Sequence, residues 1–268
     1  MRAFSAATRL GAVALSLTLL AGCASNDTVP ADGEGKYANT SERDLYELAR
    51  DALDRNLYMT AIERLEALDS RYPFGKHAEQ AQLELIYAYY ENSKWEEARA
   101  AASRFVRLHP DHPQADYAYY LRGLAAWQAG RFSLERLRVI DISKRDLGAT
   151  RDAYNDFRDL LTRYPQSDYA PDARQRVVYL RDLLARHELH VADYYLRRGA
   201  YVAAVKRGRW VLDHYPESSA NADALATMIE GYQGLGMDDR AREVLKVLKD
   251  NAPNHDQLKN DTFQPRHL

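Results

Sequence analysis

The stretch His187-Glu188-Leu189-His190 combines the residue types that bind zinc and act as a general base. In the zinc-protease pattern His-Glu-x-x-His, a spacing of four residues places both imidazoles on one helix face, with the glutamate beside the metal. Here the histidines are three residues apart, so we interpret the stretch as a solvated or partner-facing part of a long helix. The sequence also has no glycine-rich phosphate loop and no Gly-x-Ser-x-Gly elbow. We therefore predict a protein that is not an enzyme and binds no metal.

Cys23 is the only cysteine, and its surroundings predict a covalent lipid. Residues 10–21 form a short apolar run after a basic start, the pattern of a secretory signal peptide over residues 1–22. The sequence Leu20-Ala21-Gly22-Cys23 is similar to the bacterial lipobox, whose cysteine carries S-diacylglycerol and an N-palmitoyl chain. An ordinary signal peptide followed by a chance cysteine is the alternative. Because no aspartate follows Cys23, we expect sorting to the outer membrane, with no other cofactor.

The residues after Cys23 predict a flexible tether that extends to position 40. Residues 24–40 are polar, rich in small side chains and without hydrophobic periodicity, a composition that cannot bury enough apolar surface to fold by itself. The formal net charge of the chain is −2, which argues against a general nucleic-acid binder. We expect the protein to be held by its lipid on the periplasmic face of the outer membrane.

An amphipathic helix that ends just before a proline recurs along the rest of the chain. In Ala153–Pro165, small Ala153 and apolar Phe157 and Leu160 lie on one helix face, and Pro165 prevents continuation of the helix. The pattern recurs at Pro73, Pro110, Pro216 and Pro253, of which the first two and the last two are 37 residues apart. A period in the thirties is typical of tetratricopeptide-like arrays. We predict an all-α fold, an α-solenoid of five tetratricopeptide-like helical hairpins that forms an elongated right-handed superhelix.

The longer intervals between the middle prolines indicate an insertion over residues 129–149. We divide the array into N-terminal repeats 1–3 over residues 41–150, insertion included, and C-terminal repeats 3–5 over residues 151–254. Ser41, with Asp44 three residues later, is the expected N-cap of the first helix. Residues 255–268 are polar, and we expect them to form a frayed tail.

Nineteen tyrosines and a group of arginines are the main candidates for partner binding. Most tyrosines, such as Tyr87 and Tyr232, are expected to fill packing positions on first helices. In Tyr89-Tyr90, Tyr119-Tyr120 and Tyr194-Tyr195 the two rings cannot share a face, so one ring of each pair is expected on the concave or flanking surface, where such arrays bind extended peptides. Basic side chains surround the turn of repeat four, namely Arg197, Arg198, Lys206, Arg207 and Arg209. They predict either a solvated face or a docking patch for an acidic partner surface.

Several stretches resemble the YfiO/ComL-type tetratricopeptide lipoproteins of the β-barrel assembly machinery, and together they cover nearly the whole mature chain. They are LDSRYPFG at residues 68–75, LIYAYY at 85–90, RFVRLHPDHP at 104–113, DYAYYLRGL at 116–124, DISKRD at 141–146 and RRGAYVAAV at 197–205. The resemblance implies a non-enzymatic scaffold lipoprotein whose N-terminal repeats receive the C-terminal signal of unfolded outer-membrane proteins. It also implies that the C-terminal repeats dock on the periplasmic domains of the barrel-forming subunit BamA, and that smaller lipoproteins of the machinery bind the body.

Carried over by position, the resemblance implies substrate binding at Tyr72, Pro73, Phe74 and Gly75, and partner binding at Arg197, Arg198 and Arg207. Lys206 and Gly208-Arg209 depart from the family pattern and change the local charge of the docking segment. A periplasmic lipoprotein adaptor that organises cell-wall enzymes would share the anchor and the repeats, and it is the alternative function.

Overall fold

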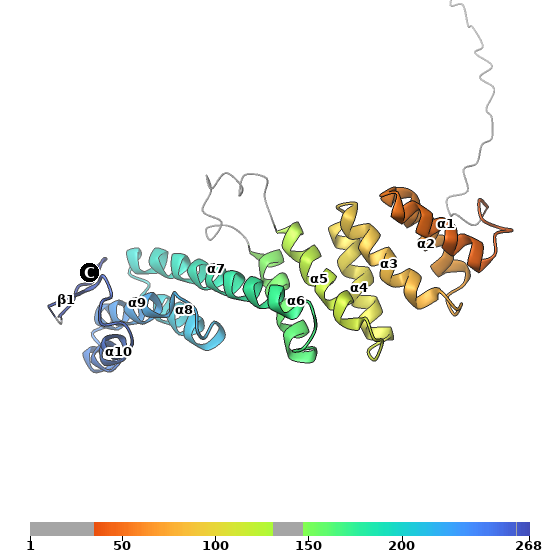
Figure 1. The fold of residues 1–268 in the computed structure, drawn as a ribbon. Helices are drawn as coiled ribbons and strands as arrows, with labels where there is room; N and C mark the ends of the chain where they lie inside the picture. The colour runs from red at the N-terminus through yellow and green to blue at the C-terminus, as the bar shows by residue number, and fades with distance from the viewer. Residues whose placement is uncertain (1–34, 131–146, 261) are drawn as a thin grey trace, which may run out of the picture.

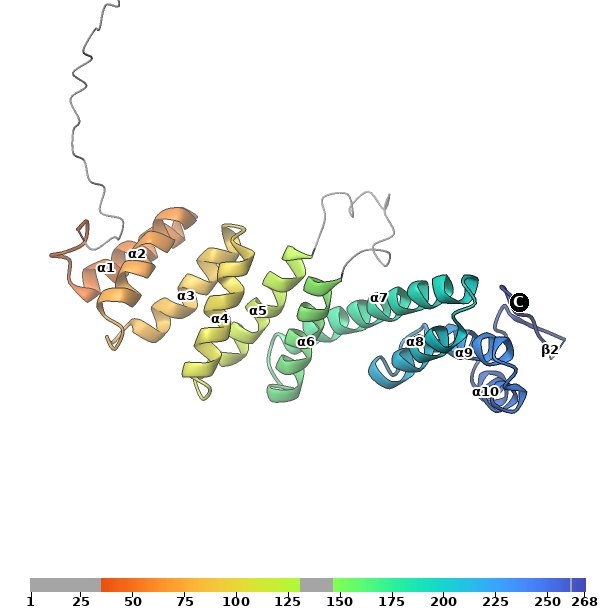
Figure 2. The ribbon, with the colours of Figure 1, turned by 180° about the vertical axis from the view of Figure 1, so that it is seen from behind.

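The computed structural model of the chain describes residues 35–130, 147–260 and 262–268, which form ten α-helices and one short β-hairpin (Figures 1 and 2). The helices are α1 (Glu42–Asp54), α2 (Tyr58–Arg71), α3 (Ala78–Glu91), α4 (Trp95–Leu108), α5 (Ala115–Ala129), α6 (Gly148–Arg163), α7 (Ala170–Arg197), α8 (Tyr201–His214), α9 (Asn221–Gly234) and α10 (Asp238–Asn251). Strands β1 (Leu258–Lys259) and β2 (Thr262–Phe263) pair antiparallel beyond the last helix.

The helices follow one another as five hairpins in an elongated row (Figure 1). Each helix packs against the next along the chain, and the first helices of neighbouring repeats also meet, because α3 contacts α5 and α7 contacts α9. We therefore take the side formed by the first helices as the concave side of the array. The predicted all-α solenoid of five tetratricopeptide-like hairpins is confirmed.

Helix α6 shows why the second helices carry the pattern found in the sequence. Ala153, Phe157 and Leu160 are fully buried in the central core. A small residue at the first of these positions lets the neighbouring helix approach, and the bulky residues at the next two fill the space between helices. The equivalent alanines, Ala61, Ala98, Ala204 and Ala241, are buried as well.

The prolines terminate the second helices through the residue that precedes each of them. A proline ring disfavours helical backbone at the preceding residue, and all five preceding residues have left the helix, with φ between −125° and −144° and ψ between 52° and 65°. Each proline then occupies the second position of a turn in which a backbone N–H donates to the carbonyl of the residue before the proline. The donors are Gly75, His112, Ser167, Ser218 and His255.

Four hairpins turn through a residue with left-handed backbone at the same place. Asn56, Ser93, Gly199 and Gly236 have φ of 58°, 60°, 68° and 68°. Glycine adopts this conformation at no steric cost, whereas a residue with a Cβ is strained there. The repeats thus use two non-glycine and two glycine residues for one backbone requirement.

We expect Gly236→Ala to lower the free energy of unfolding by about 1 kcal/mol, because alanine is strained in the left-handed backbone conformation of this position. A Cβ at Gly236 would touch nothing within 4 Å, so the loss would come from the backbone alone. Urea denaturation followed by circular dichroism measures it. The matched change Ser93→Gly should raise stability instead, and destabilisation by both substitutions would contradict the explanation.

Asp182 in the long helix α7 holds the turn between α8 and α9. Its carboxylate accepts hydrogen bonds from Ser218 Oγ (2.9 Å), Ser219 N (3.1 Å) and Ser219 Oγ (2.8 Å). Burial by itself raises the pKa of Asp182, but these hydrogen bonds outweigh burial and leave the pKa below its ordinary value. The native fold is therefore stabilised by the ionised carboxylate.

This stabilisation is expected to be present above the unfolded-state pKa of about 3.9 and to be lost as the pH falls through the lower folded-state pKa. Asp182→Asn should accordingly lower the free energy of unfolding by about 1–2 kcal/mol at neutral pH. The difference between variant and wild type should shrink once the pH is below about 3.9. Urea titrations at pH 7 and pH 3 test this, and an equal difference at both pH values would contradict it.

The predicted tether over residues 23–40 is wrong at its C-terminal end. Tyr37 is buried in the core cluster of the first repeat, and Lys36 Nζ lies 2.7 Å from Glu63 Oε1 on α2. The backbone carbonyls of Ala38 and Thr40 accept hydrogen bonds from Arg71 and Tyr72. The polar composition concealed this docking because a single buried ring and a few backbone contacts suffice for it.

The predicted frayed tail is also wrong. Residues 255–268 form the β-hairpin and a strap against the last repeats, apart from position 261, which lies outside the described residues. Phe263 is buried in the core cluster of α9 and α10. Glu230 on α9 receives the backbone N–H groups of Arg266 and His267.

Other predictions fall partly or wholly outside the described residues. Cys23 and the signal peptide over residues 1–22 lie outside them, as do residues 131–146 of the predicted insertion 129–149. The insertion is shorter than predicted, because Ala129 still belongs to α5 and α6 already begins at Gly148. Within the described residues, the length and apolar character needed to cross a membrane are not met by any helix.

Candidate functional site

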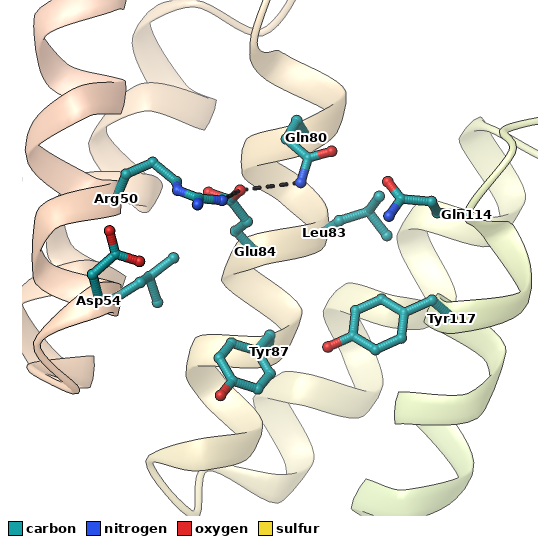
Figure 3. Close-up of a pocket in the computed structure, with 9 residues that line it drawn as sticks. Arg50, Asp54, Gln80, Leu83, Glu84, Tyr87, Gln114 and Tyr117 are labelled. Carbon is teal, nitrogen blue, oxygen red and sulfur yellow. Dashed lines mark hydrogen bonds and ion pairs between the residues drawn. The ribbon is translucent and has the colours of Figure 1, made fainter. Parts of the chain in front are cut away.

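A cavity of about 320 Å³ opens between the first helices of repeats 1, 2 and 3 (Figure 3). We call it the N-terminal cavity. Its lining residues come from α1, α3 and α5, the helices of the concave side. They are Arg50, Leu53, Asp54, Gln80, Leu83, Glu84, Tyr87, Gln114 and Tyr117.

Helical spacing brings these side chains to one place. Gln80, Glu84 and Tyr87 are four and three residues apart, so they lie on one face of α3. The opposite wall is formed by Arg50 and Asp54, one turn apart on α1 (Figure 3). The lining of the cavity is therefore mostly polar, with two tyrosines at one end, and all of it is supported by helices.

Glu84 is the buried charge of the N-terminal cavity. Its Oε1 accepts three hydrogen bonds, from Arg50 Nη1 (2.8 Å), Tyr46 OH (2.9 Å) and Gln80 Nε2 (3.0 Å). Its Oε2 is buried and has no hydrogen-bond partner among the described residues. A buried polar atom without a partner costs free energy, so the side chains around Oε2 leave this carboxylate only partly satisfied.

Two tyrosines, one on α3 and one on α5, form the aromatic end of the cavity. Tyr87 was predicted to fill a packing position, and it does pack against the central core. Because it is only half-buried, it also lines the open space together with Tyr117 (Figure 3). Burial raises the pKa of Tyr87 to about 12, and burial likewise raises the pKa of Tyr117. Both phenols are therefore neutral near pH 7 and present a ring face with a hydroxyl at its tip.

The predicted substrate-binding residues Tyr72, Pro73, Phe74 and Gly75 form the turn between α2 and α3. Two of them are held by internal contacts, because Tyr72 OH donates to Thr40 O (2.9 Å) and Gly75 N donates to Tyr72 O (2.9 Å). Phe74 is 99% exposed. The equivalent positions of the other four turns are polar, namely Asp111, Gln166, Glu217 and Asn254. Phe74 is thus the apolar exception in a repeated turn.

Contacts of α1 connect this turn to the N-terminal cavity. Glu42 Oε1 accepts the backbone N–H of His77 at 2.7 Å, and a Cβ at Gly75 would lie 2.5 Å from Glu42 Cδ. The ring of His77 stacks on Tyr46 with a centroid distance of 4.5 Å, and Tyr46 OH donates to Glu84. The turn therefore fixes the beginning of α3 against α1, and with it the cavity wall.

The predicted partner-binding residue Arg207 on α8 is engaged within the molecule. Its Nη1 lies 2.5 Å from Glu188 Oε2 on α7, with side-chain exposures of 41% for the arginine and 5% for the glutamate. The Glu188 carboxylate holds the pKa of Arg207 above its usual value. His187–His190 was interpreted as a solvated or partner-facing stretch. Within it Glu188 is buried by this pairing, whereas both histidines are half-buried.

Arg197 and Arg198 at the end of α7 are more exposed than Arg207. Arg197 Nη2 is 3.2 Å from Asp193 Oδ2 in the same helix, and the Arg198 guanidinium lies 5.6 Å from the ring centroid of Tyr194. Nearby, Arg209 Nη2 donates to Tyr232 OH at 3.1 Å. These four arginines therefore have separate partners inside the chain, and Arg197 and Arg198 keep exposed surface for a further one.

The sequence analysis did not identify Arg50, Gln80, Glu84 or Gln114. A signal was present, because Gln80 and Glu84 are polar residues one helical turn apart and Glu84 lies between the apolar residues Leu83 and Leu85. By itself this spacing does not distinguish a cavity wall from a solvated face. The contact of Glu84 with Arg50, which is 34 positions away, is what reveals the site.

A solenoid of helical hairpins places the chain in the class of repeat proteins, whose stacked repeats form an extended concave surface that commonly serves for binding. The YfiO family model, described as "Outer membrane lipoprotein", matches residues 38–248. The chain belongs to this family of outer membrane lipoproteins.

Relatives of similar length support this membership. The outer membrane protein assembly factor BamD of Vibrio cholerae is 41% identical over 237 residues, which are 88% of this chain and 95% of the relative. The protein of the same name from Neisseria meningitidis serogroup A is 41% identical over 241 residues and 90% of each chain. Among solved structures, a tetratricopeptide repeat protein from Parabacteroides merdae has a TM-score of 0.37 at 16% identity, over 78% of this chain and 79% of that one.

Proposed function

We propose that the chain is a non-enzymatic scaffold lipoprotein of the outer-membrane β-barrel assembly machinery. Its N-terminal repeats bind the C-terminal signals of unfolded outer-membrane proteins, and its C-terminal repeats dock on the periplasmic domains of BamA. The names of the relatives support the role in assembly. The observation that carries the binding role is the open N-terminal cavity, with Tyr87 and Tyr117 at its aromatic end.

The chemistry of the N-terminal cavity indicates which part of a signal it takes. Arg50 already pairs with Glu84, and Asp54 adds a second carboxylate to the lining. The cavity is therefore a poor place for the terminal carboxylate of a peptide. We assign it to an aromatic side chain of the signal, which would pack on the rings of Tyr87 and Tyr117.

Phe74 offers a second contact for the same extended segment. A fully exposed aromatic residue on a rigid turn loses apolar hydration when a partner covers it and has little conformational entropy to lose. Because the turn also fixes the beginning of α3, Phe74 and the N-terminal cavity keep a constant spacing. An unfolded client bound in this way pays an ordering cost, so binding would be weak and reversible.

The docking end is assigned to the region of Arg197, Arg198 and Arg207. The exposed guanidinium groups of Arg197 and Arg198 suit carboxylates on a partner surface. Cys23 would carry the lipid that keeps the scaffold at the periplasmic face of the outer membrane, because two or more acyl chains give stable anchoring without a spanning helix. Loss of the membrane fraction in a Cys23→Ser variant is the expected result.

Peptide binding tests the N-terminal cavity. A fluorescein-labelled peptide with a C-terminal outer-membrane signal is titrated with the mature chain and followed by anisotropy. Tyr87→Ala and Phe74→Ser should each weaken binding about tenfold, because exposed aromatic anchors contribute more than 1 kcal/mol. Trp210→Ala is the matched control, since Trp210 is an exposed aromatic residue on the second helix α8. Equal affinity for all of these proteins would overturn the assignment.

Immunoprecipitation from detergent-solubilised membranes tests the role in assembly. An antibody against the chain should recover BamA and smaller lipoproteins of the machinery. Recovery of cell-wall enzymes in place of these proteins would overturn the proposal.

A further inference from the structure

The first two repeats and the last two repeats are related by one constant shift in numbering. Adding 143 carries Asn56 to Gly199 and Ser93 to Gly236, the residues with positive φ in the hairpin turns. The same shift carries Pro73 to Pro216 and Pro110 to Pro253. The pair α1/α3 therefore corresponds residue by residue to the pair α7/α9.

This correspondence carries the N-terminal cavity onto a second cavity. The positions of Gln80, Glu84 and Tyr87 on α3 become Asp223, Thr227 and Glu230 on α9. Those of Arg50 and Leu53 on α1 become Asp193 and Leu196 on α7. All five of these equivalents line a cavity of about 310 Å³, which we call the C-terminal cavity. The array thus contains two equivalent cavities on its concave side, one between its N-terminal repeats and one between its C-terminal repeats.

The two cavities differ in what occupies them, because the C-terminal cavity is partly filled by the tail of the chain. Gln257, Arg266 and His267 complete its lining. His267 Nε2 lies 2.7 Å from Asp193 Oδ1, across the cavity on α7. Phe263 is buried nearby against the core of α9 and α10.

Glu230 shows that the tail is bound as a peptide ligand would be. Its side chain is 1% exposed, and its two oxygens accept the consecutive backbone N–H groups of His267 (2.5 Å) and Arg266 (3.1 Å). A carboxylate buried to this extent requires charge-assisted hydrogen bonds, and these two come from backbone amides of the tail. The tail also holds its own shape, because Gln264 N donates to Gln257 O at 2.8 Å.

We propose that the C-terminal cavity is a second peptide-binding site and that residues 255–268 are its intramolecular occupant. The site takes an extended segment that offers two consecutive backbone N–H groups to Glu230 and a histidine or basic side chain to Asp193. An aromatic residue precedes them, as Phe263 does in the tail. While the tail is docked, the site is closed to other chains. Its release opens the C-terminal cavity without rearrangement of the helices.

The test supplies the tail in trans to the full mature chain. The double variant Phe263→Ser/His267→Ala removes the buried ring and the contact with Asp193, and so releases the tail. A fluorescein-labelled peptide with the sequence of residues 255–268 is expected to bind this variant at least tenfold more tightly than it binds the wild type. Adding Glu230→Ala to the double variant should abolish this gain in affinity for the tail peptide. Adding Trp210→Ala, at an exposed aromatic residue on α8 that lines neither cavity, should leave the gain unchanged.

Hydrogen exchange and circular dichroism accompany the titration. The released variant should keep its helical spectrum, while the amides of Arg266 and His267 lose their protection from exchange. Persisting protection would contradict the proposal, because the removed contacts would then not hold the tail. Peptide binding of equal strength to wild type and released variant, or binding that does not depend on Glu230, would overturn it as well. The signal-peptide titration at the N-terminal cavity is a separate readout, so either proposal can fail alone.

Discussion

Replacing Phe157 with alanine is expected to lower the free energy of unfolding by about 3–5 kcal/mol, the cost of removing a large buried aromatic side chain. Phe157 is fully buried in α6. Its ring lies 6.2 Å from those of both Tyr120 and Trp127, measured between centroids. A Cβ at Gly123 of α5 would come within 2.7 Å of it. The cavity left by the substitution cannot collapse easily, because rigid helices surround it.

The chain provides a matched control for this experiment in Phe74. Phe74→Ala makes the same chemical change at a side chain that is 99% exposed, and it should leave stability within about 0.5 kcal/mol. Urea denaturation measures both variants. Because repeats contact only their neighbours, hydrogen exchange should show the loss first in α5 and α6. Equal stability of the two variants would contradict the packing account.

Arg207→Glu is the second substitution with a large expected effect. It places a carboxylate beside Glu188, which is 5% exposed, and leaves that buried charge without its partner. Breaking a fully buried ion pair costs about 3–5 kcal/mol. Arg207 is 41% exposed, so solvent screening reduces the expected loss to about 2–3 kcal/mol. Thermal and urea unfolding at neutral pH measure it.

A charge exchange separates this structural role of Arg207 from the proposed docking role. The double variant Glu188→Arg/Arg207→Glu restores an ion pair between α7 and α8 and should regain at least half of the lost stability. Recovery of BamA by immunoprecipitation should stay low if the partner contacts the arginine at position 207 itself. If the double variant regained wild-type stability and also recovered as much BamA as the wild type, Arg207 would have only a structural role. No regain of stability would contradict the ion-pair explanation.

The helical array could be predicted from the sequence because its causes are local. The predicted helix before Pro165 is α6, which ends at Arg163. The helices before the other four prolines end in the same way, at Arg71, Leu108, His214 and Asn251. Each boundary depends on a proline or a turn residue within a few positions, and each apolar face on a spacing of three or four. Ser41 likewise caps α1, with its Oγ accepting the N–H of Asp44.

The candidate sites depend on contacts between distant residues, which a spacing pattern does not contain. Glu84 gains its role from Arg50 and Tyr46, and Glu230 gains its role from a tail that begins 25 residues later, at His255. In sequence, both glutamates are single acidic residues beside apolar neighbours, and no spacing pattern points to their partners. The tail seemed frayed for the same reason, since a polar segment is ordered only when a specific surface receives its backbone amides. The turn containing Phe74 was located correctly, but its exposure could come only from the fold.

The docking of Tyr37 against the first repeat shortens the segment between Cys23 and the folded chain. It therefore limits how far the first repeat could lie from a lipid on Cys23. Residues 24–34, eleven in number, separate Cys23 from the described chain. A fully extended chain covers at most about 3.6 Å per residue, so these residues bridge no more than about 40 Å. With the proposed lipid on Cys23, the end formed by α1 and α2 would stay within about this distance of the membrane surface. Leu268, at the opposite end of the row (Figure 1), swings through a much larger volume. With that lipid, the scaffold would be attached to the membrane only at its N-terminal end, and the N-terminal cavity would remain near the membrane in every orientation of the row.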